Sequence, residues 1–503
     1  MNTPLKNLSL LGLLGLFAVG VTGCDADDPV DPPDDGVSTI YDDAFDFDND
    51  GAVDGVRVQD RGEGTGTTTW SADNTYYLDG FVFVNSGQTL TIEPGTVVKG
   101  LPGEAEDASA LIVARGGRIE AAGTQAEPIV FTAATDDVED PSDIPAGTRG
   151  LWGGVIVLGE ARTNTTPSEV AIEGIPTTEA RGLYGGTNDA DDSGTLRYIS
   201  IRYGGSDIGA GNEINGLTLG AVGSGTEIDY VEVIFNADDG VEWFGGSVNT
   251  KHLVVAFVGD DSYDYDQGFR GNGQFWFTIQ DAGTGNRAGE HDGGDGDLGG
   301  EDATPYAIPV IANATYIGSG AASANDDNDQ VLEIRDNAGA KYYASVFTDF
   351  AEDALRIEDL PDAGVEDSRA RFEAGGIELI DNVWFGFGGG ADLEAVIDLT
   401  EYDDDDNDAT PDVEVDPAFR TTLADYLAGA GNRFGTDPML RSICRTTGTC
   451  LDPRPAPGSV LLNANPTLPT GSFFQSVSYI GAFGDTNWLQ GWTALDQLGY
   501  LAN

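Results

Sequence analysis

IDYVEVIFNADDGVEWFGG (residues 228–246) is the stretch that decides the fold, because a second unit, HLVVAFVGDDSYDYDQGF (residues 252–269), repeats its plan. Each unit consists of a strand, a turn and a second strand, and aligning them places the acid pair at 238–239 about 22 residues before the pair at 260–261. A repeat of this length predicts a solenoid, in which each coil buries its apolar face only against its neighbours.

The same pattern extends along most of the chain. From about residue 74 the sequence is a succession of short runs rich in Val and Ile, separated by Gly and Asn or Asp. Such runs predict strands, and almost no amphipathic helix intervenes before residue 415, which excludes a doubly wound α/β fold. The opening runs LTIEPGTVVKG and LIVARGGRIEAAGTQAEPIVFTA are typical of a right-handed parallel β-helix. We therefore predict an all-β fold, with this β-helix and its loop excursions over residues 74–400.

The C-terminal part, residues 401–503, has a different composition. It begins with an acidic loop, EYDDDDNDATPDVEVDP, and continues with a short stretch of helical periodicity. The apolar positions of that stretch share one helical face: Phe419, Leu423, Tyr426 and Leu427. We expect the helix and the following segment to cap the last coil, because an open sheet edge invites aggregation.

Several segments together resemble a family of large bacterial surface or secreted lipoproteins, among them RGLWGGVIVLGEA, YGGTNDADDSGTLRYISIRYGG and GAFGDTNWLQGWTAL. The resemblance covers roughly residues 75–500. It implies a right-handed β-helix and a location outside the cytoplasm, but no particular biochemical activity.

The N-terminus indicates how the protein is located. Residues 1–23 are predicted to be a signal peptide, because Lys6 precedes an apolar run that is too short to span a bilayer. Val-Thr-Gly-Cys at its end resembles a bacterial lipobox, which implies cleavage before Cys24, lipidation of that residue and membrane anchoring. The alternative is an ordinary secretory signal followed by a chance Cys, with a periplasmic or secreted protein.

Residues 24–42 are rich in Pro and Asp and are predicted to be a disordered tether. An acidic run directly after a lipidated Cys resembles the surface-export signal of some Gram-negative lipoproteins, which implies the outer face of the outer membrane. The two other cysteines, Cys444 and Cys450, are predicted to form a small disulfide loop in this oxidising compartment.

The charge of the chain is extreme, with 86 acidic and 24 basic residues and a net charge of −62. A surface rich in Asp and poor in Lys suits concentrated salt, where screening is nearly complete. The same charge argues against nucleic acid as a partner and leaves divalent cations as natural ones.

One acidic motif has the spacing of a calcium loop. DFDNDGAVDG, in the predicted connector at 43–73, matches D-x-D-x-D-G-x-x-D, the pattern shared by EF-hand-like and thrombospondin type 3-like calcium repeats. The predicted ligands of a structural calcium ion are Asp46, Asp48, Asp50, Asp54 and the carbonyl of Ala52. The twelfth position, normally a bidentate acid, is Arg57.

The two acid pairs of the repeat form a second constellation, together with Asn236, Glu242, Asp264 and Asp266. Equivalent positions of successive coils stack about 4.8 Å apart, so the pairs predict a carboxylate ladder. Two carboxylates are what glycoside hydrolysis needs, and FNADDG and GDD faintly resemble motifs of polygalacturonase-like hydrolases. The Gly-His-Gly and Arg-Ile-Lys motifs of those hydrolases are absent here. The residues that an enzyme would use are Asp239, Asp260, Asp261 and the nearby Arg270; the alternative is a set of corner-turn acids or a cation site.

Aromatic residues near the ladder predict a sugar-stacking platform, formed by Tyr263, Tyr265, Phe269 and Trp276. Alternation in FWFTI points Trp276 outward, although at least half of these aromatics fit equally well in the core.

These observations predict a lipid-anchored surface β-helix stabilised by calcium, most simply a non-catalytic adhesin that binds an extracellular glycan or a surface protein. The first alternative is a polysaccharide-degrading hydrolase or lyase that uses the stacked acids. The second is a structural component of the envelope.

Overall fold

The computed structural model describes residues 38–206, 214–296, 298–325, 327–360, 367–399 and 416–502. The predicted signal peptide, Cys24, most of the tether and the acidic loop up to residue 415 lie outside these ranges. No helix in the described ranges combines the length and the apolar character needed to cross a bilayer.

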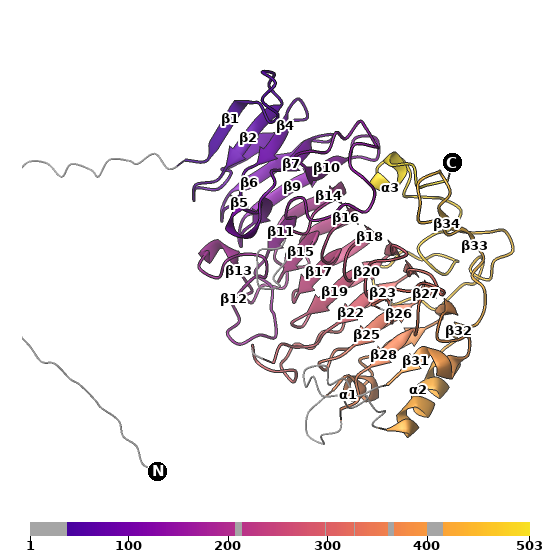
Figure 1. Ribbon diagram of the computed structural model, residues 1–503. Helices are drawn as coiled ribbons and strands as arrows, with labels where there is room; N and C mark the ends of the chain where they lie inside the picture. The colour runs from indigo at the N-terminus through magenta and orange to yellow at the C-terminus, as the bar shows by residue number, and fades with distance from the viewer. Residues whose placement is uncertain are drawn as a thin grey trace, which may run out of the picture. The chain divides into compact units, whose positions relative to one another are not determined.

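The described residues form a parallel β-helix, which confirms the predicted fold (Figure 1). One side is a ten-stranded parallel sheet, in which each strand pairs with the equivalent strands of the coils before and after it. In spatial order its strands are β5 (Phe81–Val84), β8 (Ala110–Val113), β11 (Val155–Leu158), β15 (Leu217–Gly220), β17 (Val241–Phe244), β19 (Tyr263–Asp266), β22 (Gly289–His291), β25 (Leu332–Ile334), β28 (Leu355–Ile357) and β31 (Ile397–Asp398).

The rest of the solenoid wall is a sheet of twenty described strands, whose pairings are parallel except between β1 and β2. Its strands are β1 (Ile40–Phe45), β2 (Gly55–Gln59), β3 (Thr68–Trp70), β4 (Thr75–Leu78), β6 (Thr89–Ile92), β7 (Val97–Gly100), β9 (Arg118–Ala122), β10 (Ile129–Ala133), β14 (Gly194–Arg202), β16 (Glu227–Ile234), β18 (Asn249–Ala256), β20 (Asn272–Gln274), β21 (Phe277–Ile279), β23 (Val310–Ala312), β24 (Thr315–Ile317), β26 (Lys341–Tyr343), β27 (Val346–Phe350), β29 (Glu378–Ile380), β30 (Val383–Phe387) and β32 (Arg433–Phe434). Because β2 pairs with β4, the predicted connector belongs to this sheet.

The long strands β14, β16 and β18 bend at one non-glycine residue each. Tyr198, Tyr230 and His252 adopt positive φ angles of 50°, 58° and 45° at equivalent positions of successive coils. The left-handed conformation turns the strand at a corner, and the three rings stack on one another, with centroids 4.4 Å and 4.1 Å apart. The side-chain alternation therefore restarts at each corner.

A loop excursion between β11 and β14 covers part of the ten-stranded sheet. It contains β12 (Val170–Ala171), the 3₁₀ turn η2 (Ala180–Gly182) and β13 (Leu183–Tyr184). Its apolar side chains, including Val170 and Ile175, pack against Ile112 and Ile156 on the outer face of β8 and β11. The excursion therefore covers the outer face of the ten-stranded sheet over β8 and β11.

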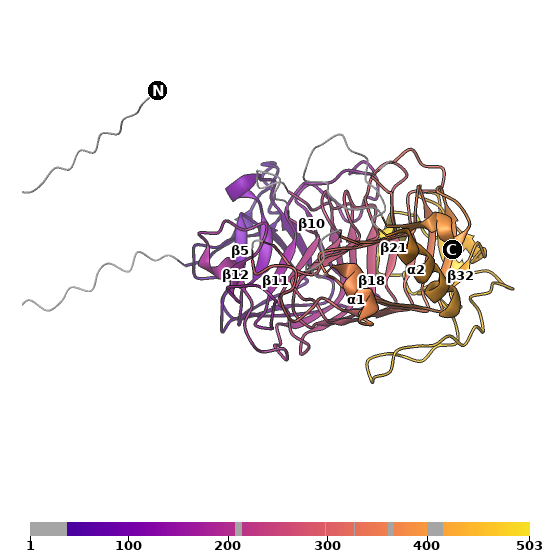
Figure 2. The same cartoon turned by 90° about the horizontal axis from the view of Figure 1, so that it is seen from below.

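The predicted helix is α2 (Pro417–Gly429), which lies at the opposite end of the solenoid from β1 (Figure 1) and from β5 (Figure 2). Asp416 caps its N-terminus by accepting from the backbone N–H of Ala418, and Phe419 and Leu423 are buried on its inner face. Shorter elements of the described chain are η1 (Ala105–Asp107), α1 (Ser368–Glu373), η3 (Leu393–Val396), β33 (Leu440–Ser442), β34 (Asp452–Pro455) and α3 (Ala494–Gln497).

The segment after α2 does not stay at the last coil, which differs from the predicted cap. It returns along the twenty-stranded sheet, where Gln475 exchanges hydrogen bonds with Gln274 and α3 reaches Arg202 of β14. Near its end, the carbonyl of Gln490 accepts from Gln125, which follows β9. We call residues 440–502 the C-terminal strap; it connects the last coils with the early ones (Figure 1).

Candidate functional site

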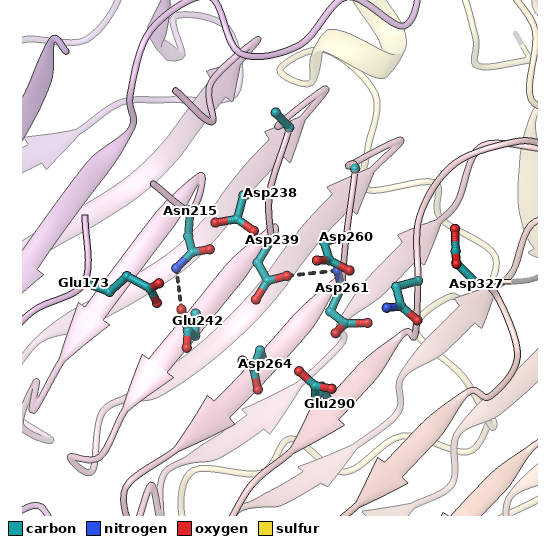
Figure 3. A pocket seen from close by; sticks show the side chains of 13 residues that line it. Glu173, Asn215, Asp238, Asp239, Glu242, Asp260, Asp261, Asp264, Glu290 and Asp327 are labelled. Carbon is teal, nitrogen blue, oxygen red and sulfur yellow. Dashed lines mark hydrogen bonds between the residues drawn. The ribbon is translucent and has the colours of Figure 1, made fainter. Parts of the chain in front are cut away.

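A cleft of about 530 Å³ lies over β17, β19 and β22 of the ten-stranded sheet (Figure 3). No arginine, lysine or histidine is among its lining residues, which all belong to the described part of the chain. Nine of the lining side chains are carboxylic acids: Glu173, Asp238, Asp239, Glu242, Asp260, Asp261, Asp264, Glu290 and Asp327. We call this feature the acidic cleft.

The strands supply one row of these acids. Along β17 and β19 the aromatic side chains of Trp243 and Tyr263 point into the core, so Glu242 and Asp264 point outward. The register pairs Glu242 with Asp264 and Asp264 with Glu290, which places three carboxylates side by side on neighbouring strands. Glu242 is 6% and Asp264 9% exposed.

The turns that precede β17 and β19 supply a second row. The buried Asn236 fixes the first turn, since its amide donates to the carbonyl of Asp239 at 2.8 Å. The carboxylate of Asp239 accepts from the backbone N–H of Asp261 at 2.9 Å, and the carboxylate of Asp261 accepts from the backbone N–H of Arg287. The stacked turns therefore hold their acids in place through the backbone of the next coil.

More distant segments complete the cleft. Glu173 comes from the excursion that contains β12, and Asp327 comes from the loop between β24 and β25. Asn215, at the entrance to β15, donates to the carboxylate of Glu242 (Figure 3).

The carboxylate oxygens converge in two groups that share one residue. Asp238, Asp239 and Asp260 form one triad, and Asp239, Glu242 and Asp264 form the other; within each triad the oxygens lie within 4.8 Å of one another. Atom Oδ1 of Asp264 is buried and has no hydrogen-bond partner among the described residues. An unpartnered buried carboxylate oxygen is costly, so its environment calls for a cation or another donor.

Basic side chains are placed beyond the cleft, along the same face of the sheet. Glu333 on β25 is the next outward acid after Glu290. It forms ion pairs with Arg287 at 2.6 Å and with Arg356 at 3.1 Å. Asp239, Glu242 and Asp264 form no ion pair within the described ranges. The face is therefore balanced by arginines over β22 to β28 and strongly negative over β17 and β19.

Burial and mutual repulsion both act on the cleft acids. Burial raises the pKa of Asp239, Glu242 and Asp264 well above its usual range, and neighbouring carboxylates raise it further. The pKa of Glu290 is raised to about 7, first by burial and then by the charge of Asp292. The cleft therefore favours protonated acids or bound cations over free carboxylates.

This raises a prediction for stability in the absence of divalent cations. A carboxyl with a raised folded-state pKa stabilises the fold fully below its unfolded pKa, and that stability is lost as the pH rises through the folded value. In EGTA we expect the melting temperature to fall as the pH rises above the ordinary range of carboxyl pKa values, because the pKa of both Glu242 and Asp264 is raised in the folded state. The fall should be smaller in the Glu242→Gln/Asp264→Asn variant, measured by thermal unfolding.

The two proteins share the groups that act in the opposite direction, among them His291 and acids with a lowered pKa such as Asp189. Burial lowers the pKa of His291 to about 3, so its contribution to stability grows as the pH rises. It cancels in the comparison between wild type and variant. An equal dependence on pH in both proteins would show that these two acids are not destabilised in the folded state.

The predicted aromatic platform is wrong. Tyr263, Tyr265, Phe269 and Trp276 are each at most 1% exposed and lie in the core of the β-helix. Phe275, with a φ of 61°, resets the alternation between β20 and β21, so Trp276 points inward.

The predicted cation of the enzyme hypothesis is also misplaced. Arg270 pairs with Asp189 at 2.5 Å and does not line the cleft, whereas Asp239, Asp260 and Asp261 do. The guanidinium whose charge acts on Asp261 belongs to Arg287, which follows the second repeat unit in the chain. Arg270 lies close to these acids in the sequence, but in the fold its side chain pairs with Asp189. Glu242 and Asp264, which belong to the predicted constellation, line the cleft, but no local signal in the sequence marks Glu173 or Asp327.

The connector brings together three of its five predicted calcium ligands. Oxygens of Asp46, Asp48 and Asp50 lie within 4.8 Å of one another. Asp54 instead accepts from the backbone N–H of Phe47 at 2.6 Å. Arg57, at the twelfth position, faces Asp42 and Asp79 at 3.5 and 3.8 Å.

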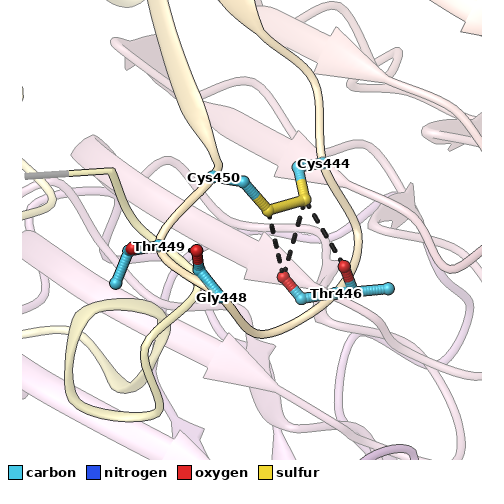
Figure 4. Close-up of a disulfide and its surroundings, with 5 residues drawn as sticks. All are labelled: Cys444, Thr446, Gly448, Thr449 and Cys450. Carbon is cyan, nitrogen blue, oxygen red and sulfur yellow. Dashed lines mark hydrogen bonds between the residues drawn. A yellow bond between two sulfur atoms is a disulfide. The ribbon is translucent and has the colours of Figure 1, made fainter.

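A disulfide joins Cys444 to Cys450, the pair predicted from the sequence (Figure 4). It closes a small loop of the C-terminal strap, next to the hydrogen bond between the N–H of Leu451 and the carbonyl of Tyr500.

Comparison with known proteins gives one match. The family model described as a pectate-lyase-like beta helix domain matches residues 62–429. No curated protein and no solved structure matches the chain.

Proposed function

We propose that this chain, which belongs to the pectate-lyase-like β-helix domain family, binds glycans through divalent cations held in its acidic cleft. The observation that carries the proposal is the convergence of nine carboxylic acids in one cleft that no basic side chain lines within the described ranges. In a chain with a net charge of −62, the close packing of these carboxylates is electrostatically unfavourable unless cations bind between them.

The spacing of the acids fits a hard cation. Calcium binds six to eight oxygens at about 2.3–2.6 Å, so two oxygens on one ion lie at most about 5 Å apart. The oxygens of each cleft triad lie within 4.8 Å of one another. Calcium is therefore the cation that we expect, with carboxylates as its main ligands.

A cation also explains how a glycan would attach to this surface. The carboxylates of a triad leave coordination positions that glycan hydroxyl or carboxylate oxygens would fill. Because the predicted aromatic platform is buried in the core, the cation is the main recognition element in the cleft. For a polyuronate, it would also overcome the repulsion between two polyanions.

The test is retention of glycans with calcium and with EGTA, using alginate as a polyuronate and soluble starch as a neutral glucan. We expect the wild type to retain alginate only with calcium and the Asp239→Asn/Asp264→Asn variant to lose most of this retention. Asp43→Asn/Asp73→Asn, which removes two exposed acids elsewhere, should behave as wild type. Retention that is indifferent to calcium in all three proteins would contradict the proposal.

A hydrolase is the second candidate, favoured by the raised pKa of buried acids such as Asp261 beside the open cleft. Glycosidases separate their two carboxyl groups by about 5 Å or more to admit the glycosidic bond, whereas the oxygens within each cleft triad lie within 4.8 Å of one another. Non-catalytic binding therefore fits better. Release of reducing or unsaturated ends from the same glycans, lost in Asp260→Asn/Asp261→Asn, would establish an enzyme instead.

The cellular setting of this proposal rests on the sequence alone. Lipid on Cys24 would hold the protein at the outer membrane, with the acidic tether giving the β-helix reach. Fatty-acid labelling of wild type but not of Cys24→Ala is the expected result. A second, structural calcium ion in the connector, on Asp46, Asp48 and Asp50, would stiffen the junction between tether and β-helix.

A further inference from the structure

We infer that the acidic cleft holds two divalent cations bridged by Asp239, and not one. The inference rests on the proposed function, because it specifies how many cations the same cleft binds. Its observations are the two overlapping triads, the unpartnered oxygen of Asp264 and the absence of basic side chains from the lining of the cleft.

The geometry separates the cleft acids into two sets of ligands. The turns contribute Asp238 and Asp260, the strands contribute Glu242 and Asp264, and only Asp239 belongs to both triads. Among the described residues, no larger group of acids meets the same limit of 4.8 Å. One ion with oxygens at about 2.3–2.6 Å therefore cannot take all five carboxylates, whereas two ions can.

Asp239 is positioned to bridge. Its side chain lies at the first turn, directly before β17, and its Oδ1 atom accepts the backbone N–H of Asp261 at 2.9 Å. This hydrogen bond fixes the orientation of the carboxylate between the two rows of acids. A carboxylate has about four lone-pair sites, so one backbone hydrogen bond leaves acceptor capacity for two cations.

The inner set carries a direct sign of a missing partner. Asp264 is 9% exposed and lines the cleft, yet its Oδ1 atom has no described hydrogen-bond partner. Its neighbour Glu242, 6% exposed, has one donor in the amide of Asn215. Both carboxylates therefore present oxygens to the cleft that protein donors do not saturate.

Charge balance favours two ions over one. Five ionised carboxylates carry five negative charges, and a single dication leaves three of them at close range. Within the described ranges, Asp239, Glu242, Asp260 and Asp264 form no ion pair, and Arg287 and Arg356 are paired with Glu333. A second dication brings the group close to neutrality, as the arginines do for the neighbouring acids on β22 to β28.

The experiment counts ions per chain by equilibrium dialysis against calcium, followed by metal analysis. The purified protein carries Asp48→Asn/Asp50→Asn, so that an ion in the connector does not contribute. Binding to other acids is common to all variants and is removed by comparing them. The control is Asp43→Asn/Asp73→Asn in the same background, which should lose no ion.

We expect Asp239→Asn to lose two ions, Glu242→Gln/Asp264→Asn to lose one, and Asp238→Asn/Asp260→Asn to lose the other. Loss of a single ion in Asp239→Asn would overturn the two-ion cleft while leaving cation binding intact. No loss in any cleft variant would overturn the proposed function as well. Circular dichroism of each variant separates loss of binding from loss of folding.

A second readout does not depend on counting. Terbium and europium bound together in the cleft should show energy transfer between the two ions, which requires that they lie close to one another. The transfer should disappear in Asp238→Asn/Asp260→Asn, although one ion still binds. Transfer that is absent from the background protein itself would contradict the inference.

Discussion

Replacing Trp276 with alanine is expected to lower the free energy of unfolding by about 3–5 kcal/mol, the usual cost of deleting a large buried aromatic side chain. The indole is 1% exposed, stacks on Trp243 with ring centroids 5.0 Å apart and donates to the hydroxyl of Thr250 at 3.1 Å. Denaturant unfolding followed by circular dichroism measures the change. Because the side chain points away from the cleft, calcium-dependent glycan retention by the folded variant should be unchanged.

Trp276→Phe is the matched control, since it keeps an aromatic ring in the core and removes only part of the volume and the indole hydrogen bond. It should lose less stability than Trp276→Ala. A Trp276→Ala variant that unfolds like the wild type but fails to retain glycans would place this side chain on the surface, as a sugar-stacking residue, and would contradict the structure.

Replacing Glu232 with alanine is expected to cost about 3–5 kcal/mol, because it removes one partner from a buried, charged network. This carboxylate of β16 is fully buried and accepts from Ser200 at 2.5 Å and from the backbone N–H groups of Ala494 and Leu495 at 2.6 and 3.1 Å. The variant leaves these donors without their acceptor and removes the carboxylate whose charge interacts with Arg202. The loss is measured by denaturant unfolding.

Limited proteolysis provides a local measurement for the same variant. Since two of the donors belong to the C-terminal strap, we expect cleavage within the strap to become faster in Glu232→Ala before the β-helix unfolds. Glu227→Ala is the control: this exposed acid at the start of the same strand faces Arg197 at 3.7 Å, an interaction worth under about 1 kcal/mol. Equal cleavage of both variants would show that Glu232 does not hold the strap.

The repeat pattern was sufficient to predict the fold, because each coil has apolar strand faces that only its neighbouring coils can bury. Strand, turn and strand recur at a similar spacing, and apolar runs such as those of β16 and β18 can be buried only by stacking. The same reasoning placed Asp239 and Asp260 on successive turns. Both lie in the acidic cleft.

The failures of sequence reasoning have two physical causes. The alternation rule that pointed Trp276 outward assumes an unbroken strand, but the left-handed conformation of Phe275 resets it. Such corners have no residue signature here, since Tyr, His, Phe, Asn, Ala and Asp all occupy them. Contacts between distant segments are the other cause: nothing near Glu173 in sequence indicates that its excursion ends at the cleft.

The C-terminal strap changes how such a molecule is assembled and lost. In a simple solenoid every coil touches only its neighbours, so an end coil can open without disturbing the rest. Here the hydrogen bonds from Gln125 to Gln490 and from Arg202 to Gln497 join residues that are separated by most of the chain. These contacts form only after synthesis has reached the last residues, so the early coils gain this stabilisation only when the whole chain has been made. Once the strap has docked, opening at either end has to break long-range contacts as well as contacts between neighbouring coils. We therefore expect the β-helix to unfold as one cooperative unit and not coil by coil.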